Sequence, residues 1–309
     1  MRILVATDFS PRSQRAVRRA GILAGQSGGG VILMHVVEGA GAREVARDVC
    51  EAQRMTVELV TVVPELFRVE CRALVVAGAL PDAVLDAATA READLIVVGV
   101  PLRGTARDPG RMVRNLIRSP PCPVLVVNRP AAGPYARVML PVDLTDASAR
   151  ALRSAASLGL ADDAHVTVVH AFEVLGKPKL SGFGVPHEQI DGYVEGWRSS
   201  FAEEVEAFLG AEGLAGRDWV RRVEEGRADE VIANLAARTC SELLVMGTHA
   251  RTGIRRALLG SVTEAVLSVG GADVLVVPPP RSGADSRLDR PGRPSAVRAE
   301  RPALRVVSA

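Results

Sequence analysis

The two halves of the chain repeat one pattern, and this limits the possible folds more than any other feature. The run Val138 to Val142 matches the run Ile3 to Thr7 at a spacing of 135 residues, and Asp143 then falls on Asp8. The segments VTVVHAF and VILMHVV align at the same spacing, so that both copies carry a histidine there. Because the match recurs at several independent positions, it predicts two copies of one domain.

Within each copy, short apolar runs alternate with segments of helical pattern. In the first copy the runs 3–6, 31–37, 73–76, 95–98 and 124–127 predict strands, and helices are expected near 11–24, 42–59 and 82–92. The second copy has a longer loop at 177–186 and a longer helix near 188–209, after which the spacing becomes 148 residues. Such alternation predicts parallel sheets with right-handed crossovers.

The expected fold class is therefore α/β, with two doubly wound five-stranded parallel-sheet (Rossmann-like) domains in tandem. Aromatic residues make up only 3% of the chain, so the core is aliphatic, which suits parallel sheets covered on both faces. We expect one domain over residues 1–129 and a second over 135–278, joined by a Pro/Gly linker. Residues 279–309 are rich in Pro, Arg, Ser and Gly, and we expect them to form a disordered tail.

The stretch from Leu243 to Val277 is the most informative local segment. An apolar run ends at Gly247, a polar loop with further glycines follows, a helical pattern starts at Ser261, and a second apolar run closes the segment. Free backbone N–H groups in such a loop, together with the start of the helix, favour an anion, most often a phosphate. The structural alternative stays open, because Ser261-x-x-Glu264 is a capping box that a helix needs with or without a ligand.

Parallel α/β sheets bind ligands beyond the carboxyl ends of their strands, where the strand order reverses. Asp8 and Asp143 follow the first strand of each copy, and Gly99 and Gly247 follow the fourth. The sequence predicts that these positions are neighbours. Asp143 has a structural alternative too, because an Asp just before a helix can serve as a cap alone, and its recurrence at Asp8 favours that role.

Composition excludes several other classes of protein. Lysine occurs only at positions 177 and 179, so no glycine-rich loop supplies a P-loop lysine, and G-x-G-x-x-G is absent. The net charge of +2 combines +4 in residues 281–309 (seven Arg against three acidic residues) with about −2 elsewhere, so the expected folded part shows no basic excess for nucleic acid. No signal-peptide or membrane-spanning run is present, and the four cysteines form no CxxC, which predicts a cytoplasmic protein.

Candidate catalytic and metal-ligating groups are also missing from the pattern. His35 and His170 end their strands without a Ser or carboxylate partner at a diagnostic spacing, so we interpret both as packed or hydrogen-bonded. The sequence contains no cluster with metal-ligand spacing. His249 lies in the glycine loop, either as a phosphate contact or as an exposed turn residue.

These features together resemble a known family. The universal stress protein nucleotide-binding pattern is G-x2-G-x9-G-[ST], and here it reads Gly247, Ala250, Gly260 and Ser261 with every spacing kept. The second copy resembles a universal stress protein domain, and residues 1–278 resemble a tandem universal stress protein.

The resemblance implies a binding site for ATP or ADP in the second copy, with any Mg²⁺ held largely through the phosphates. Pro141 and Asp143 would face the adenosine, and the backbone of Ala171 would border the adenine. The residues implied to line the nucleotide or hold its phosphates are Met246, Gly247, His249, Ala250, Gly260, Ser261, Val262 and Thr263. Ala250 adds a methyl group where the family has glycine, and it would be strained if its φ were positive.

The first copy departs further from the pattern. Gly99-Val-Pro-Leu102 replaces the first half of the motif, and Gly110-Arg111 stands where Gly260-Ser261 stands. We expect this copy not to bind ATP. The resemblance also implies that the two fifth strands, Val124 to Val127 and Val274 to Val277, pair to form a pseudo-dimer within the chain, from which a higher homo-oligomer can be built.

Three functions follow as hypotheses. The first is a nucleotide-binding stress-response protein, of signalling or regulatory type, with ATP or ADP in the second domain and unidentified protein partners. The second is a slow ATPase or phosphoryl-transfer enzyme of the same fold, although the sequence supplies no evident base or metal carboxylate pair. The third is a nucleotide-free structural dimerisation module.

Overall fold

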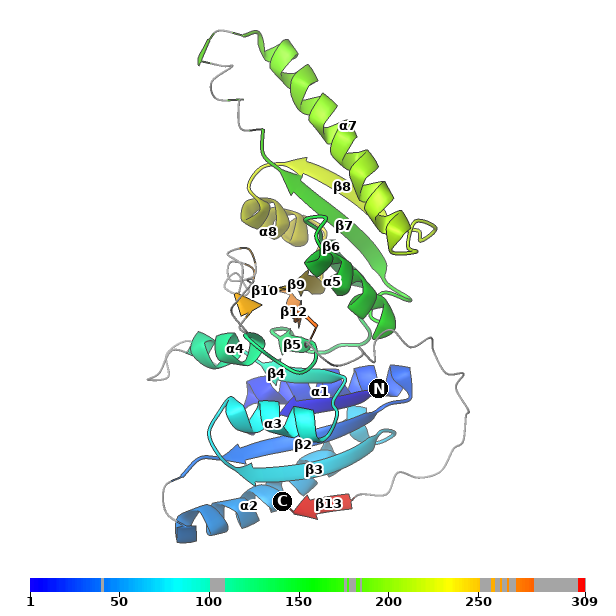
Figure 1. Ribbon diagram of the computed structural model, residues 1–309. Helices are drawn as coiled ribbons and strands as arrows, with labels where there is room; N and C mark the ends of the chain where they lie inside the picture. Colours follow the sequence, from blue (N-terminus) through cyan, green and yellow to red (C-terminus); the bar gives the residue numbers. More distant parts are fainter. Residues whose placement is uncertain are drawn as a thin grey trace. The chain divides into compact units, whose positions relative to one another are not determined.

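The computed structural model describes residues 1–39, 42–100, 109–174, 177, 182–183, 185–250, 257–258, 262, 266, 271–280 and 305–308 (Figure 1). The chain divides into two compact units. The first comprises Met1–Pro134, Thr248–Leu259 and Asp273–Ala309, and the second comprises Tyr135–Gly247 and Gly260–Ala272.

The first unit contains the predicted doubly wound sheet. Its parallel strands lie in the order β3-β2-β1-β4-β5, so the strand order reverses beside β1. The strands are β1 (Arg2–Ala6), β2 (Gly30–Val37), β3 (Glu70–Ala77), β4 (Leu95–Gly99) and β5 (Val124–Val127). The helices are α1 (Pro11–Ser27), α2 (Ala42–Val62), the short 3-10 helix η1 (Pro64–Leu66), α3 (Asp82–Ala90) and α4 (Pro109–Ile117).

Local chemistry explains where α1 begins and ends. The Ser10 hydroxyl accepts a hydrogen bond from the N–H of Ser13, and Pro11 occupies the first helical position, where no N–H is needed. At the other end Gly28 takes a left-handed conformation with φ of 60°, which glycine adopts without steric cost. The predicted start is therefore confirmed, and the helix continues to Ser27, three residues beyond the prediction.

Two further strands belong to the first unit. The strand β12 (Asp273–Val277) pairs antiparallel with β5, with Leu275 opposite Leu125, so the predicted pairing of the two fifth strands is confirmed. The strand β13 (Arg305–Ser308) lies parallel to β3 at the edge of the sheet. At these four residues the structure differs from the predicted disordered tail, and the apolar pair Val306–Val307 supplies a short strand pattern.

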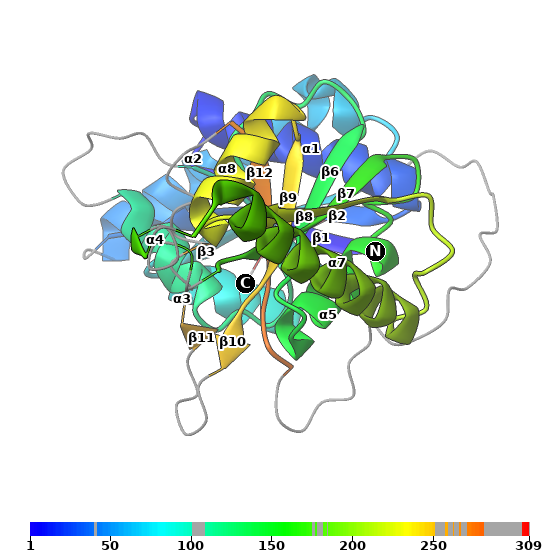
Figure 2. The same cartoon turned by 90° about the horizontal axis from the view of Figure 1, so that it is seen from above.

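The second unit repeats the same order with β9-β6-β7-β8 in parallel. Its strands are β6 (Arg137–Pro141), β7 (His165–Phe172), β8 (Val220–Glu225) and β9 (Leu243–Gly247), and its helices are α5 (Asp146–Ser157), α7 (His187–Ala211) and α8 (Ala228–Arg238). Helix α5 packs on β6 and β9, α7 on β8, and α8 on β7. Figure 2 shows α7 lying over β8. The predicted long helix is thus α7.

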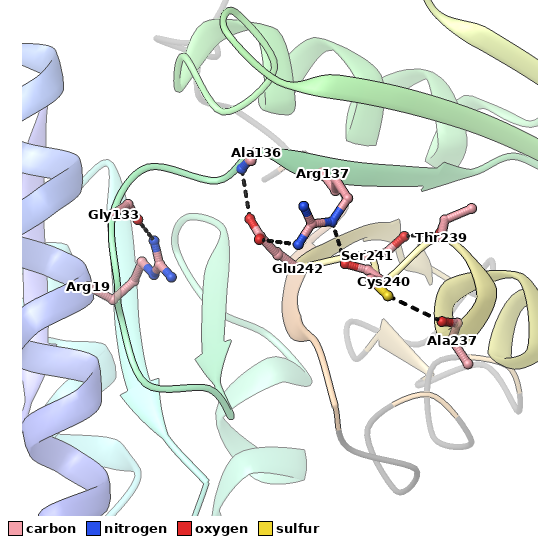
Figure 3. A network of polar contacts seen from close by, with 9 residues as sticks. All are labelled: Arg19, Gly133, Ala136, Arg137, Ala237, Thr239, Cys240, Ser241 and Glu242. Atoms are coloured by element: carbon pink, nitrogen blue, oxygen red, sulfur yellow. Dashed lines mark hydrogen bonds and ion pairs between the residues drawn. The ribbon is translucent and has the colours of Figure 1, made fainter.

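Both units fasten the amino ends of their strands in the same way. In the second unit the Arg137 guanidinium binds Glu242 (Nη2 to Oε1, 2.6 Å) and the carbonyl oxygen of Cys240 (2.8 Å), as Figure 3 shows. In the first unit the guanidinium of Arg2 donates to the Glu92 carbonyl oxygen at 3.3 Å, and the backbone N–H of Arg2 donates to Asp94 Oδ2 at 2.7 Å. The spacings of 135 and 148 residues found in the sequence therefore correspond to equivalent places in two similar structures.

A buried ion pair holds β12 in the first unit. Arg19 Nε lies 3.4 Å from Asp273 Oδ2, and the two side chains are 5% and 0% exposed. Arg19 Nη1 also donates to the Gly133 carbonyl oxygen at 2.6 Å (Figure 3). Asp273 Oδ1 accepts the N–H groups of Asn128 and Arg129 at 2.8 and 3.0 Å. One carboxylate thus joins the end of β5, the helix α1 and the start of β12.

Among the described residues, no helix has the length and apolar character needed to cross a membrane.

Candidate functional site

The carboxyl ends of β6, β7 and β9 form one edge of the second unit, and the strand order reverses there between β9 and β7. Pro141 ends β6, Ala171 is the penultimate residue of β7, and Gly247 ends β9; all three are half-buried. Met246 is buried in the core with 6% exposure. The structure therefore brings these four predicted positions to the edge where parallel α/β sheets bind ligands.

Asp143 organises the turn that follows β6. Its Oδ1 accepts hydrogen bonds from the Thr145 N–H (3.2 Å), the Thr145 hydroxyl (2.6 Å) and the Ser148 hydroxyl, while its own N–H donates to Ser148 Oγ at 2.9 Å. Leu144 between them adopts φ of 61°, a left-handed conformation that is uncommon for a residue with a side chain. Asp143 therefore has a structural role in this turn, whereas the N-cap of α5 is Thr145, which makes no side-chain capping hydrogen bond. Asp143 itself is exposed at the edge of the sheet.

The first unit builds the same turn around Asp8. Asp8 Oδ1 accepts the Ser10 N–H at 3.0 Å, the Asp8 N–H donates to Ser13 Oγ at 3.3 Å, and Phe9 has φ of 60°. Burial opposes ionisation of Asp8, but hydrogen bonds from Ser10 and Ser13 outweigh it and lower the pKa of the carboxyl below 3.8. The strained turn is therefore a property of the domain and is independent of the phosphate motif.

This lowered pKa predicts an acid-dependent contribution to stability. The ionised Asp8 is favoured in the folded state, so its contribution is present above pH 3.8 and is lost as the pH falls through the lower pKa of the folded state. We expect Asp8→Asn to be less stable than the wild type near neutral pH and to approach it in strong acid. Urea unfolding between pH 2.5 and 6 tests this, and a stability difference that does not change with pH would contradict it.

The two histidines near the carboxyl ends of β2 and β7 make equivalent hydrogen bonds. His170 Nδ1 lies 2.9 Å from the Val142 carbonyl oxygen, and His35 Nδ1 lies 2.8 Å from that of Thr7. Because a carbonyl oxygen only accepts, Nδ1 must carry the proton in both rings. The prediction that these histidines are hydrogen-bonded is confirmed.

The first glycine of the motif has a packing role. A Cβ atom on Gly247 would lie 2.1 Å from the carbonyl oxygen of Ala147 in the first turn of α5. A Cβ atom on Gly99 would lie 2.7 Å from the carbonyl oxygen of Arg12 in α1. Glycine therefore permits the close approach of helix and strand in both copies, and Gly247 by itself does not distinguish a binding domain from an empty one.

The segment Thr248–Leu259 belongs to the first unit. The N–H of the buried Thr248 donates to the Val277 carbonyl oxygen at 2.9 Å. His249 and Ala250 form β10 (His249–Ala250), which pairs antiparallel with β11 (Ala257–Leu258). The sequence predicts a polar loop with free backbone N–H groups here, and the structure differs at these four residues, where the backbone pairs as two short strands. The side chain of Ala250 lies outside the described part of the chain, so the strain considered from the sequence stays a prediction.

The implied phosphate contacts lie mostly outside the described residues, as Gly260, Ser261 and Thr263 do. Val262 is described as helical and half-buried, and Val266 as helical and buried. Their spacing of four residues agrees with the helix predicted to start at Ser261.

The sequence analysis did not identify two serines of the site. Ser13 and Ser148 hold the Asp turns through their hydroxyl groups. The repeat contained the signal, because both serines follow their Asp by five residues and match at a spacing of 135. In the part of the chain that the structure describes, no group of three or more His, Cys, Asp or Glu side chains is placed to hold a metal ion.

Comparison with known proteins supports the family resemblance found in the sequence. A family model described as the universal stress protein family matches residues 1–128 and again 134–278. A universal stress protein of Methanocaldococcus jannaschii is 30% identical over 151 residues, covering 48% of this chain and 84% of the relative. A match to universal stress protein E of Escherichia coli is 39% identical over 67 residues and spans only 22% of this chain and 21% of that protein.

Among solved structures, a universal stress protein from Archaeoglobus fulgidus superposes with a TM-score of 0.63 at 17% identity, covering 90% of this chain and 98% of the other. At this identity the superposition shows a shared fold. The two family matches together span most of the sequence, with one match in each half of the chain. The chain therefore belongs to the universal stress protein family, with two such domains in tandem.

Proposed function

We propose that this protein binds one adenine nucleotide, ATP or ADP, in its second repeat and acts as a signalling or regulatory protein in the stress response. The observation that carries the proposal is the meeting of Pro141, Asp143 and Ala171 at the carboxyl edge of the second sheet. They meet in the same repeat whose sequence keeps the spacing from Gly247 to Gly260-Ser261. Adenosine would bind at the strand ends, and the phosphates at the residues after Gly260.

The first repeat differs where the adenosine would lie. The Phe9 ring of its Asp turn stacks on His35 with ring centroids 4.5 Å apart, and it packs against the cluster of Val37, Ala52 and Val75. In the second repeat the ring beside His170 is Phe201, which comes from α7. Arg111 lies in the first turn of α4, where Ser261 would begin a helix in the other repeat. Both differences support nucleotide binding in the second repeat alone.

Titration calorimetry tests the proposal directly. We expect about one ATP per chain, and we expect Ser261→Arg, which copies the first repeat, to weaken binding at least a hundredfold, equivalent to about 2.7 kcal/mol. The matched control is Arg111→Ser in the first repeat, which leaves one site of unchanged affinity. Two sites in the wild type, or unchanged binding by Ser261→Arg, would contradict the assignment.

Binding would act through a shift of populations between states of the loop after Gly247, which a protein partner then distinguishes. Any Mg²⁺ would enter with the nucleotide, because this cation is usually held through phosphate oxygens and water. The fifth strands already pair within the chain, which supports a pseudo-dimer in which one repeat binds and the other assists.

Specific observations also favour a second candidate, a nucleotide-free pairing module. Gly247 and Asp143 both have structural roles, and the pairing of β10 with β11 uses backbone groups of the loop. Heat denaturation of the purified protein followed by chromatography of the supernatant separates the two candidates. Released adenine nucleotide near one per chain supports the first, whereas no release together with no ATP binding supports the second.

A further inference from the structure

An aromatic ring from α7 supports the end of β7 in the second unit. The Phe201 ring lies 5.0 Å from the His170 ring and 5.2 Å from the Phe172 ring, measured between centroids. These two residues flank Ala171, whose backbone would border the adenine. Phe201 is half-buried and packs on the cluster of Phe172, Ile190 and Val194, so its position is fixed by the core.

The His170 ring is hydrogen-bonded to the backbone that directly follows the neighbouring strand β6. Its Nδ1–H donates to the carbonyl oxygen of Val142, and the Val142 N–H donates to the Val169 carbonyl oxygen at 2.8 Å. Val142 lies between Pro141 and Asp143 in the chain. One imidazole therefore joins the ends of β6 and β7, next to the backbone hydrogen bond between the two strands.

In the first unit, the aromatic ring that packs on the equivalent histidine comes from a different part of the domain. His35 makes the equivalent bond to Thr7, but the ring that stacks on it is Phe9, which belongs to the Asp turn itself. In the second unit that turn position is Leu144. A supporting ring is thus present in both repeats, and in the second repeat it comes from a helix rather than from the turn.

From this contrast we infer that Phe201 is a positioning residue of the second-repeat nucleotide site, which acts through His170 and determines how well the site distinguishes adenine from guanine. The inference rests on the function proposed above. Phe201 fixes the imidazole, the imidazole fixes the backbone at residues 142 and 171, and that backbone presents the hydrogen-bonding groups that a base edge meets.

Three variants of the full chain test the inference. Phe201→Leu keeps an apolar side chain and removes the ring. Phe208→Leu makes the same change at another half-buried ring of α7 and is the matched control. Phe201→Tyr restores the ring and serves as the conservative rescue.

The first measurement needs no nucleotide. Nitrogen-15 NMR of the histidine rings reports which nitrogen carries the proton. We expect His170 to be protonated at Nδ1 in the wild type, in Phe208→Leu and in Phe201→Tyr, and to show a mixture of tautomers in Phe201→Leu. His35, which has its own supporting ring, provides the unchanged reference in every spectrum.

The second measurement is the ratio of ATP to GTP affinity. We expect Phe201→Leu to lower this ratio about tenfold, while Phe208→Leu and Phe201→Tyr keep the wild-type ratio. A retained Nδ1–H tautomer, or equal loss of affinity for both nucleotides, would overturn the inference. If the wild type binds neither nucleotide, the proposed function fails and the inference with it, whereas a normal wild type with an unchanged ratio in Phe201→Leu refutes the inference alone.

Discussion

Asp273→Asn is expected to lower the free energy of unfolding of the first unit by about 3–5 kcal/mol, because it leaves the buried Arg19 charge without its counter-ion. The two side chains are 5% and 0% exposed, so water cannot replace the lost carboxylate. The substitution keeps the size of the side chain, and the amide oxygen can still accept the N–H groups of Asn128 and Arg129. The loss therefore reports on charge rather than on packing.

Urea denaturation combined with amide hydrogen exchange measures this effect, because exchange locates the opening at β5 and β12. The matched control is Glu70→Gln, which breaks an ion pair of 2.7 Å whose side chains are 49% and 58% exposed. Exposed pairs contribute about 0–1 kcal/mol, so this variant should be close to wild type. A loss below 1 kcal/mol for Asp273→Asn would show that the pair does not hold β12 in place.

Gly247→Ala is expected to have the second large effect, a loss of more than about 3 kcal/mol, because the added methyl overlaps backbone rather than a movable side chain. Its Cβ would lie 2.1 Å from the carbonyl oxygen of Ala147, so the first turn of α5 must move. That turn carries Ser148, which bonds Asp143, so the variant should also lose nucleotide binding. Thermal unfolding and ATP titration measure the two losses.

A glycine elsewhere in the chain provides a control for which the same substitution is expected to raise stability. Gly192 lies within α7, and a Cβ atom there would meet nothing within 4 Å. Gly192→Ala should therefore stabilise the protein by about 0.5–1 kcal/mol through helix propensity alone. If Gly247→Ala were as harmless as this control, the close approach of α5 to β9 would be incorrect.

Much of the architecture could be predicted because its signals are local or repeated. Buried parallel strands read as continuous apolar runs, so β1, β4 and β5 were found within a residue or two. The start of α1 followed from Ser10 and Pro11, whose capping chemistry acts within a few residues. The pairing of β5 with β12 followed from resemblance to a family, since nothing in either strand alone selects its partner.

Features that depend on contacts in space were not predictable from the pattern. The pairing of β10 with β11 depends on how a polar loop folds back on itself, and polar loops carry no periodicity. The ion pair of Arg19 with Asp273 joins residues more than two hundred positions apart in the sequence. Neither residue recurs at the matching position of the other copy, so the repeat does not indicate that they pair. Ligand binding at Ser261 and its neighbours stays a prediction.

The sequence by itself determined the tandem arrangement, the fold class, the family and the edge of the sheet at which the candidate site lies, because repeats, apolar runs and motif spacing are written along the chain. Only the tertiary structure decided that Gly247 is required by α5, that Phe9 and Phe201 support equivalent histidines from different places, and that β12 is fastened in the first unit by a buried carboxylate. The physical reason is that steric contact, ring packing and desolvated charge pairs depend on distances in space, which residue order does not specify.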